Sequence, residues 1–153
     1  MGMRKSQVKY FDTHFSATIY NYSFKVHGRR YGSPTLLGLL EIKNEITDSV
    51  SMSFNENREL VLTFRVNDTL RTKILKGQFS EKGYYEIFLR YKKYEIPPGF
   101  PIIYGNNNIN RIRMALTLEG DLIIDNMWDE AANIFLIGAG DKGRRQSFFK
   151  TKF

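Results

Sequence analysis

The chain of 153 residues contains no cysteine. Disulfide bonds, catalytic thiolates, cysteine-ligated zinc and iron–sulfur clusters are therefore excluded. The chain also lacks any apolar run approaching the roughly 20 residues of a membrane-spanning helix. Its first residues, MGMRKSQVKYFDTHF, are partly basic but contain no apolar stretch typical of a secretory signal. If the chain is exported, it is stabilised by packing alone.

Histidine is almost absent as well, with only His14 and His27. Neither has a carboxylate or a second histidine at a ligand-like spacing, so we expect neither a metal site nor a catalytic triad. Asp125, Asp129 and Glu130 are close enough in sequence to suggest a catalytic carboxylate pair. However, Asp125 fits the alternation of a strand, and the other two begin a predicted turn. We therefore predict a protein that is not an enzyme, with no catalytic residue, no metal and no cofactor.

Acidic residues are outnumbered by basic ones, 16 against 23, which gives a net charge of +7. Residues 1–34 contain six Lys and Arg and one Asp, so most of the excess lies in this part. Such a segment can bind phosphates or an anionic membrane surface. A solvated strand and loop also explain it, and we favour this second interpretation.

Tryptophan is scarce, with one residue, whereas 12 Phe and 9 Tyr favour β structure. Turn clusters rich in Gly, Asn and Asp recur about every 10 to 13 residues except across residues 95–108, and such spacing is typical of an all-β sandwich or barrel. The clusters are 55–57, 67–68, 80–83, 119–121, 129–133 and 140–143. Between them, apolar and polar residues alternate with the period of a half-buried strand.

The alternation predicts which residues share a face, and we expect the more apolar face of each strand to point inward and the polar face outward. The more apolar faces of two strands are formed by Leu60, Leu62, Phe64 and Val66 and by Tyr20, Tyr22, Phe24 and Val26. The opposite, more polar faces of two other strands are formed by Arg111, Arg113, Ala115, Thr117 and Glu119 and by Tyr84, Glu86, Phe88, Arg90 and Lys92. Residues 35–43 fit a strand or a short helix, and we favour a strand bent at Gly38. Residues 95–110 contain three prolines and predict a long loop.

Helical periodicity is missing over any three turns, so the fold class is all-β. We predict an antiparallel up-and-down meander of about 8–10 strands that closes into a barrel, with a β-sandwich as the alternative. Both arrangements protect the strand edges. Residues 1–153 form a single domain with a basic N-terminal lead segment at about 1–16.

Residues 138–143, GAGDKG, match the dinucleotide-binding pattern G-x-G-x-x-G. That pattern needs a following helix, a partner strand and an acidic residue about 20 positions later. The ten residues after Gly143 include no acid and alternate like a strand. The sequence therefore predicts a hairpin turn at Gly140–Gly143, between a strand at Ile134–Gly138 and a last strand from Arg145.

The consecutive hairpins, the G-D-L turn at 120–122 and the W-D-E stretch at 128–130 resemble the lipocalin-like (calycin) β-barrel group. Within this group they are similar to small lipocalin-like lipoproteins of bacterial envelopes. The resemblance covers residues 36–150, although the G-x-W of the group is missing. It implies a cell-envelope or secreted location rather than a cytoplasmic one, for a mature form without its signal. Membrane association would then depend on a removed lipid anchor.

The resemblance implies a binding protein that holds a small hydrophobic or amphipathic molecule inside the barrel. The candidate ligand-binding residues are Phe64, Tyr91, Met114 and Trp128. The same residues could simply fill the core. The alternative is an interaction module that binds a protein, polysaccharide or nucleic acid through a basic and aromatic outer face. Nucleic acid is the partner least expected, because cross-strand packing explains the same residues.

Overall fold

The computed structural model describes residues 8–9, 11–28, 32–43, 46–95, 105–134 and 137–152. Within these ranges, the side chains of 91–95, 105–107, 130–134 and 137–141 are left out of the description. The described residues form twelve strands and one short helix. All strand pairs among them are antiparallel, which confirms the all-β prediction.

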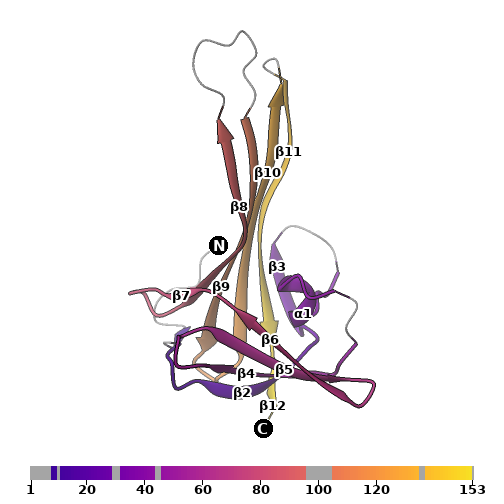
Figure 1. The fold of residues 1–153 in the computed structure, drawn as a ribbon, viewed down its shortest axis with the longest axis vertical. Coiled ribbons are helices and arrows are strands. Elements are labelled where there is room, and N and C mark those ends of the chain that lie inside the picture. Colours follow the sequence, from indigo (N-terminus) through magenta and orange to yellow (C-terminus); the bar gives the residue numbers. More distant parts are fainter. Residues whose placement is uncertain are drawn as a thin grey trace.

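The larger of two sheets has seven strands and forms the long axis of the molecule (Figure 1). Its order is β3 (Lys25–Gly28), β11 (Ile137–Phe149), β10 (Leu122–Ile134), β9 (Gly105–Thr117), β8 (Tyr85–Glu95) and β7 (Gln78–Phe79). The short β1 (Val8–Lys9) pairs with the C-terminal end of β9.

The smaller sheet has five strands and packs across the lower part of the larger one (Figure 1). Its order is β12 (Thr151–Lys152), β2 (Ser16–Tyr20), β4 (Ser49–Phe54), β5 (Leu60–Val66) and β6 (Thr69–Leu75).

The predicted closed barrel is not found among the described strands, and the two sheets are consistent with the β-sandwich alternative. Along the described strands the chain passes between the sheets five times, from β1 to β2, β2 to β3, β3 to β4, β6 to β7 and β11 to β12. A meander in which each strand pairs with the next holds only within β4–β6 and within β7–β11. These passages divide the strands between two separate sheets, whose inner faces are protected by packing on each other.

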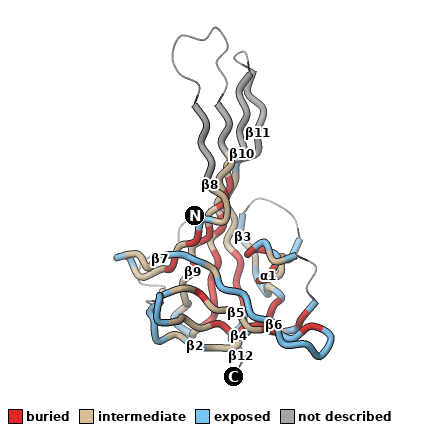
Figure 2. The backbone as a smooth tube through the Cα atoms, viewed as in Figure 1, coloured by how far each residue is buried: buried red, intermediate tan, exposed pale blue. Residues whose placement is uncertain are grey.

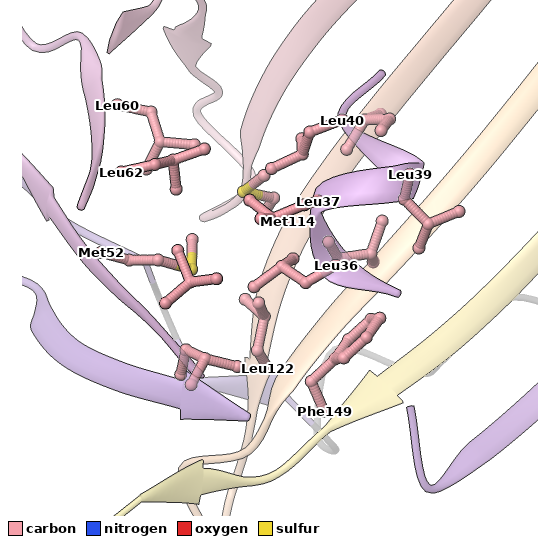
Figure 3. Packing of buried hydrophobic residues seen from close by; sticks show 14 of the residues in the cluster. Leu36, Leu37, Leu39, Leu40, Met52, Leu60, Leu62, Met114, Leu122 and Phe149 are labelled. Atoms are coloured by element: carbon pink, nitrogen blue, oxygen red, sulfur yellow. The ribbon is translucent and has the colours of Figure 1, made fainter. Parts of the chain in front are cut away.

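One hydrophobic cluster joins the inner faces of the two sheets (Figures 2 and 3). Met52, Leu60 and Leu62 enter it from the smaller sheet, and Met114 and Leu122 enter it from the larger sheet. Each of these side chains is at most 1% exposed. The alternation predicted for residues 60–66 is therefore confirmed, because its apolar residues are the buried ones.

Helix α1 (Leu36–Leu39) covers the open side of this core, where a bent strand was expected. Thr35 caps it, since its Oγ1 accepts a hydrogen bond from the Gly38 N–H at 3.0 Å. Leu36 and Leu37 are at most 1% exposed. The strand predicted at 35–43 is thus wrong. A helix of four residues is too short to show a helical period in sequence.

Strands β8 to β11 continue well beyond the smaller sheet as a projecting ribbon (Figure 1). Strands β10 and β11 pair without interruption from Leu122 and Phe149 to Ile134 and Ile137. The turns predicted at 129–133 and 140–143 are therefore wrong, because both segments lie inside strands. Strand β9 begins at Gly105, so the end of the loop predicted at 95–110 is also strand.

We expect stability to fall above pH 10 in part because of Tyr85. Burial raises the pKa of this phenol above its ordinary value of 10.0, and the hydroxyl donates to the carbonyl of Arg58 at 2.9 Å. The unfolded chain then loses this proton at lower pH than the folded protein, so the free energy of unfolding decreases as pH rises through that window. Tyr85→Phe should cost about 1 kcal/mol at pH 7 and flatten the alkaline decrease. Urea unfolding at pH 7 to 11 measures both, and an unchanged pH slope would contradict the assignment.

Candidate functional site

Three of the four predicted ligand-binding residues have described side chains, and all three are buried. Phe64 on β5 and Met114 on β9 are 2% and 0% exposed and belong to the shared core. Trp128 on β10 is 3% exposed, lies outside that cluster and packs over Gly143 of β11. The side chain of Tyr91 is outside the described residues. The structure thus brings together only Phe64 and Met114, as parts of one packed core.

Strand β8 presents fewer cations outward than its alternation predicts. The pairing register with β9 shifts between Phe88 and Arg90. A bulge of this kind moves the following residues to the opposite face. Arg90 consequently forms an ion pair with Glu41, which follows α1, at 2.9 Å from Nη2 to Oε1. The prediction that Arg90 shares a face with Phe88 is wrong, and the side chain of Lys92 lies outside the described residues.

Glu41 also accepts a hydrogen bond from a pair of buried asparagines on the inner face of the larger sheet. Asn110 Nδ2 donates to Glu41 Oε1 at 3.0 Å, and Asn126 Nδ2 donates to Asn110 Oδ1 at 2.6 Å. Both asparagines are less than 9% exposed. Because buried polar groups need partners, this network explains why polar residues are tolerated directly above the core.

The outer face of the larger sheet, which faces away from the smaller sheet, carries two strong cross-strand ion pairs. Arg113 Nε on β9 donates to Glu86 Oε2 on β8 at 2.6 Å. Arg144 on β11 donates from Nε and Nη2 to the two oxygens of Asp125 on β10, at 2.7 and 2.6 Å. The hydrogen bonds that Arg144 donates to Asp125 raise the pKa of Arg144 above its ordinary value. Bidentate pairs of this kind fix both groups in place.

In both pairs the carboxylate lies beneath the arginine. The side chains of Glu86 and Asp125 are each 13% exposed, whereas those of Arg113 and Arg144 are 31% and 47% exposed. A guanidinium has five N–H donors, and these pairs use only some of them. A molecule that approaches this face therefore meets cationic donors first.

A groove of 220 Å³ lies between the two arginines. Ala115 and Ile123, which are direct partners on β9 and β10, form its apolar floor. Tyr84 borders it and lies under the guanidinium of Arg113, 4.8 Å from ring centroid to Cζ. We call these residues, together with Lys82, Asp125 and Arg144, the arginine groove. Three cations against one carboxylate give this set a net charge of +2.

The alternation of residues 111–119 placed Arg113 and Ala115 outward, and the groove confirms this. Sequence reasoning did not connect them with Tyr84, Asp125 or Arg144. A signal was present, because acids and bases alternate along consecutive hairpin strands and opposite charges pair across them. Only the register shows which of these charges face one another.

The described residues contain no group of three or more His, Asp or Glu side chains that could hold a metal ion. His14 is exposed and lies 3.8 Å from Asp12. His27 on β3 is also exposed and packs edge-on against Phe148, with ring centroids 5.8 Å apart.

Within the part of the chain that the structure describes, no helix is both long and apolar enough to cross a bilayer.

No protein-family model, curated protein or solved structure matches this chain. The resemblance to the lipocalin-like group therefore stays a prediction, and the function has to be argued from the arginine groove itself.

Proposed function

We propose that this protein is a non-enzymatic binding protein that holds a small anionic amphipathic molecule in the arginine groove. The observation that carries the proposal is the position of Arg113 and Arg144 above their carboxylates. Their outward N–H groups can donate to a carboxylate, sulfonate or phosphate oxygen. Ala115 and Ile123 then contact the apolar part of the same molecule.

The size of the groove limits what it can cover. Small-molecule sites that enclose a whole ligand commonly measure about 300–1,000 Å³. A groove of 220 Å³ matches the anionic end and the first few carbon atoms of a ligand. We infer that the rest of the molecule lies along the outer face or in solvent.

The groove supports ligand binding better than the interior predicted from sequence. Phe64 and Met114, two of the predicted interior contacts, are packed into the core that both sheets share, and Met114 is also one of the residues around the groove. The amphipathic ligand of the sequence prediction is retained, but its location moves to the outer face. A cell-envelope or secreted location stays a prediction.

An NMR titration with octanoate, with 1-octanol as the neutral control, tests the proposal. We expect octanoate to shift the backbone amide signals of Ala115 and Ile123, and 1-octanol to shift them much less. Arg113→Gln combined with Arg144→Gln removes two charged donors and should weaken octanoate binding by about tenfold or more. Lys73→Gln with Lys76→Gln, on exposed positions of and next to β6, removes the same number of charges elsewhere and should leave octanoate binding unchanged.

Asp125→Asn should change octanoate affinity in the opposite direction. It removes the carboxylate that holds Arg144, so the net charge of the groove rises and octanoate should bind more tightly. Equal shifts from octanoate and 1-octanol, or weaker octanoate binding by the Asp125 variant, would contradict the proposal.

A further inference from the structure

The passage from β2 to β3 exposes three aromatic rings that the sequence pattern assigned to a buried face. Tyr20, Tyr22 and Phe24 are 42%, 52% and 51% exposed. Asn21 between them is 1% exposed. The predicted inward orientation of Tyr20, Tyr22 and Phe24 is therefore wrong, and Asn21 points inward instead.

Hydrogen bonds of Asn21 explain this reversal. Its Nδ2 donates to the carbonyl of Thr47 at 2.9 Å, and its Oδ1 accepts from the N–H of Leu37 at 3.1 Å. The backbone of Asn21 also bonds to Asp48 and to Leu36, at the start of α1. One inward amide thus ties the passage to α1 and to the loop before β4. Tyr20 and Tyr22, on either side of this inward amide, are 42% and 52% exposed.

Lysines accompany the exposed rings. Lys150 Nζ lies 4.6 Å from the ring centroid of Phe24, and Lys152 Nζ lies 5.9 Å from that of Tyr20. Lys25 Nζ lies 5.4 Å from the ring centroid of Phe148. We call Tyr20, Tyr22, Phe24, Lys25, Lys150 and Lys152 the aromatic–lysine edge. Asp121 bonds to Lys150 at 2.7 Å, so the edge and this carboxylate together carry a charge of +2.

The two backbone segments that form this edge, β2–β3 and β11–β12, pair with each other in both sheets. The N–H of Tyr20 donates to the carbonyl of Lys150 at 2.9 Å, and the N–H of Phe24 donates to that of Phe148 at 3.0 Å. The rings are therefore attached to paired backbone and present a fixed surface. Strands β2 and β12 lie at the end of the molecule opposite the projecting ribbon of β8–β11, so a flat surface can approach them without meeting it (Figure 1).

We propose that the aromatic–lysine edge binds the surface of an anionic lipid bilayer. Tyr and other aromatic rings favour the headgroup region, and lysines near it are attracted to anionic lipids. Stacking with nucleic-acid bases requires open ring faces. Here ammonium groups lie over the rings of Phe24 and Tyr20, and the exposed part of each ring, 51% and 42%, is available to a headgroup layer. The edge borders the arginine groove, because Phe148, which contacts Phe24 and Lys25, is the cross-strand partner of Ile123 on the groove floor. The inference rests on other residues and does not depend on ligand binding in the groove.

Co-sedimentation of the full chain with vesicles tests this proposal. We expect binding to vesicles of phosphatidylcholine and phosphatidylglycerol at 7:3, and at least tenfold weaker binding to phosphatidylcholine alone. Lys25→Glu with Lys152→Glu should reduce binding to the anionic vesicles by about tenfold or more, since each lysine contributes separately. Lys73→Glu with Lys76→Glu, on exposed positions of and next to β6, makes the same charge change elsewhere and should retain most of the binding.

Tryptophan fluorescence tests separately whether the aromatic side chains of the edge enter the headgroup layer of the bilayer. Tyr22→Trp keeps an aromatic side chain, and its fluorescence should shift to the blue on anionic vesicles. Arg113→Gln with Arg144→Gln should keep vesicle binding, which separates this proposal from the function of the groove. Equal binding to neutral vesicles, an equal loss with the Lys73 and Lys76 variant, or no blue shift would overturn the proposal. So would tighter binding to a single-stranded oligonucleotide, lost with the Lys25 and Lys152 variant.

Discussion

Replacement of Gly143 by alanine is expected to lower the free energy of unfolding by about 1–3 kcal/mol, as overpacking does in other cores. Gly143 on β11 and Trp128 on β10 are direct cross-strand partners. A Cβ at position 143 would lie 2.7 Å from the indole Cε2 and 2.8 Å from Cη2, inside van der Waals contact. Trp128 is only 3% exposed, so its ring cannot move away without disturbing its packing. Urea unfolding of both proteins measures the loss.

A double-mutant cycle identifies the indole as the cause. In a Trp128→Leu background the space above Gly143 is wider, so the same Gly143→Ala change should cost much less. The coupling between the two changes should be about 0.5–3 kcal/mol, the range for residues in direct contact. An equal loss in both backgrounds would instead show that the backbone conformation of Gly143 sets the cost.

This contact also accounts for Gly143, the last glycine of the G-x-G-x-x-G match at residues 138–143. The sequence was sufficient to reject a dinucleotide site, and the motif indeed lies inside β11 rather than between a strand and a helix. The turn predicted in its place was wrong, because glycine within a strand can mark either a bend or the close approach of another group. Trp128 lies fifteen positions from Gly143 in the sequence, and only the pairing of β10 with β11 brings them together.

Apolar alternation predicted faces well where a strand stays within one sheet. Residues 60–66 bury the predicted side, because β5 is bordered by β4 and β6 and packs on the core. Residues 20–26 leave one sheet and join the other, and there the hydrogen bonds of Asn21 decide the orientation. A prediction from alternation assumes that burial of apolar side chains decides which face of a strand points inward. This assumption fails where a buried polar side chain needs hydrogen-bond partners.

The arginine groove could be predicted only in part. Alternation placed Arg113 and Ala115 on an outer face, as the structure does. The bulge between Phe88 and Arg90 removed one expected cation from that face, and nothing in the local sequence marks its position. The pairing of Arg144 with Asp125 depends on register, which long-range packing sets.

Replacement of Phe64 by alanine should lower the free energy of unfolding by about 3–5 kcal/mol, as is typical when a buried aromatic side chain is deleted. Phe64 is 2% exposed and belongs to the core shared by the two sheets. The deleted ring leaves a cavity that the strands around it can close only partly. Urea unfolding at pH 7 measures the loss.

Phe88→Ala is the matched control for this change, because Phe88 lies on β8 with 44% of its surface exposed. The same deletion there should cost less than about 1.5 kcal/mol, since much of the ring is already in water. Octanoate binding separates a core residue from a ligand contact. Under conditions where the Phe64 variant is folded, its affinity for octanoate should equal that of the unmodified protein, because the arginine groove lies on the opposite face of the larger sheet. A small stability loss combined with lost octanoate binding would instead return Phe64 to the ligand site that its sequence pattern suggested.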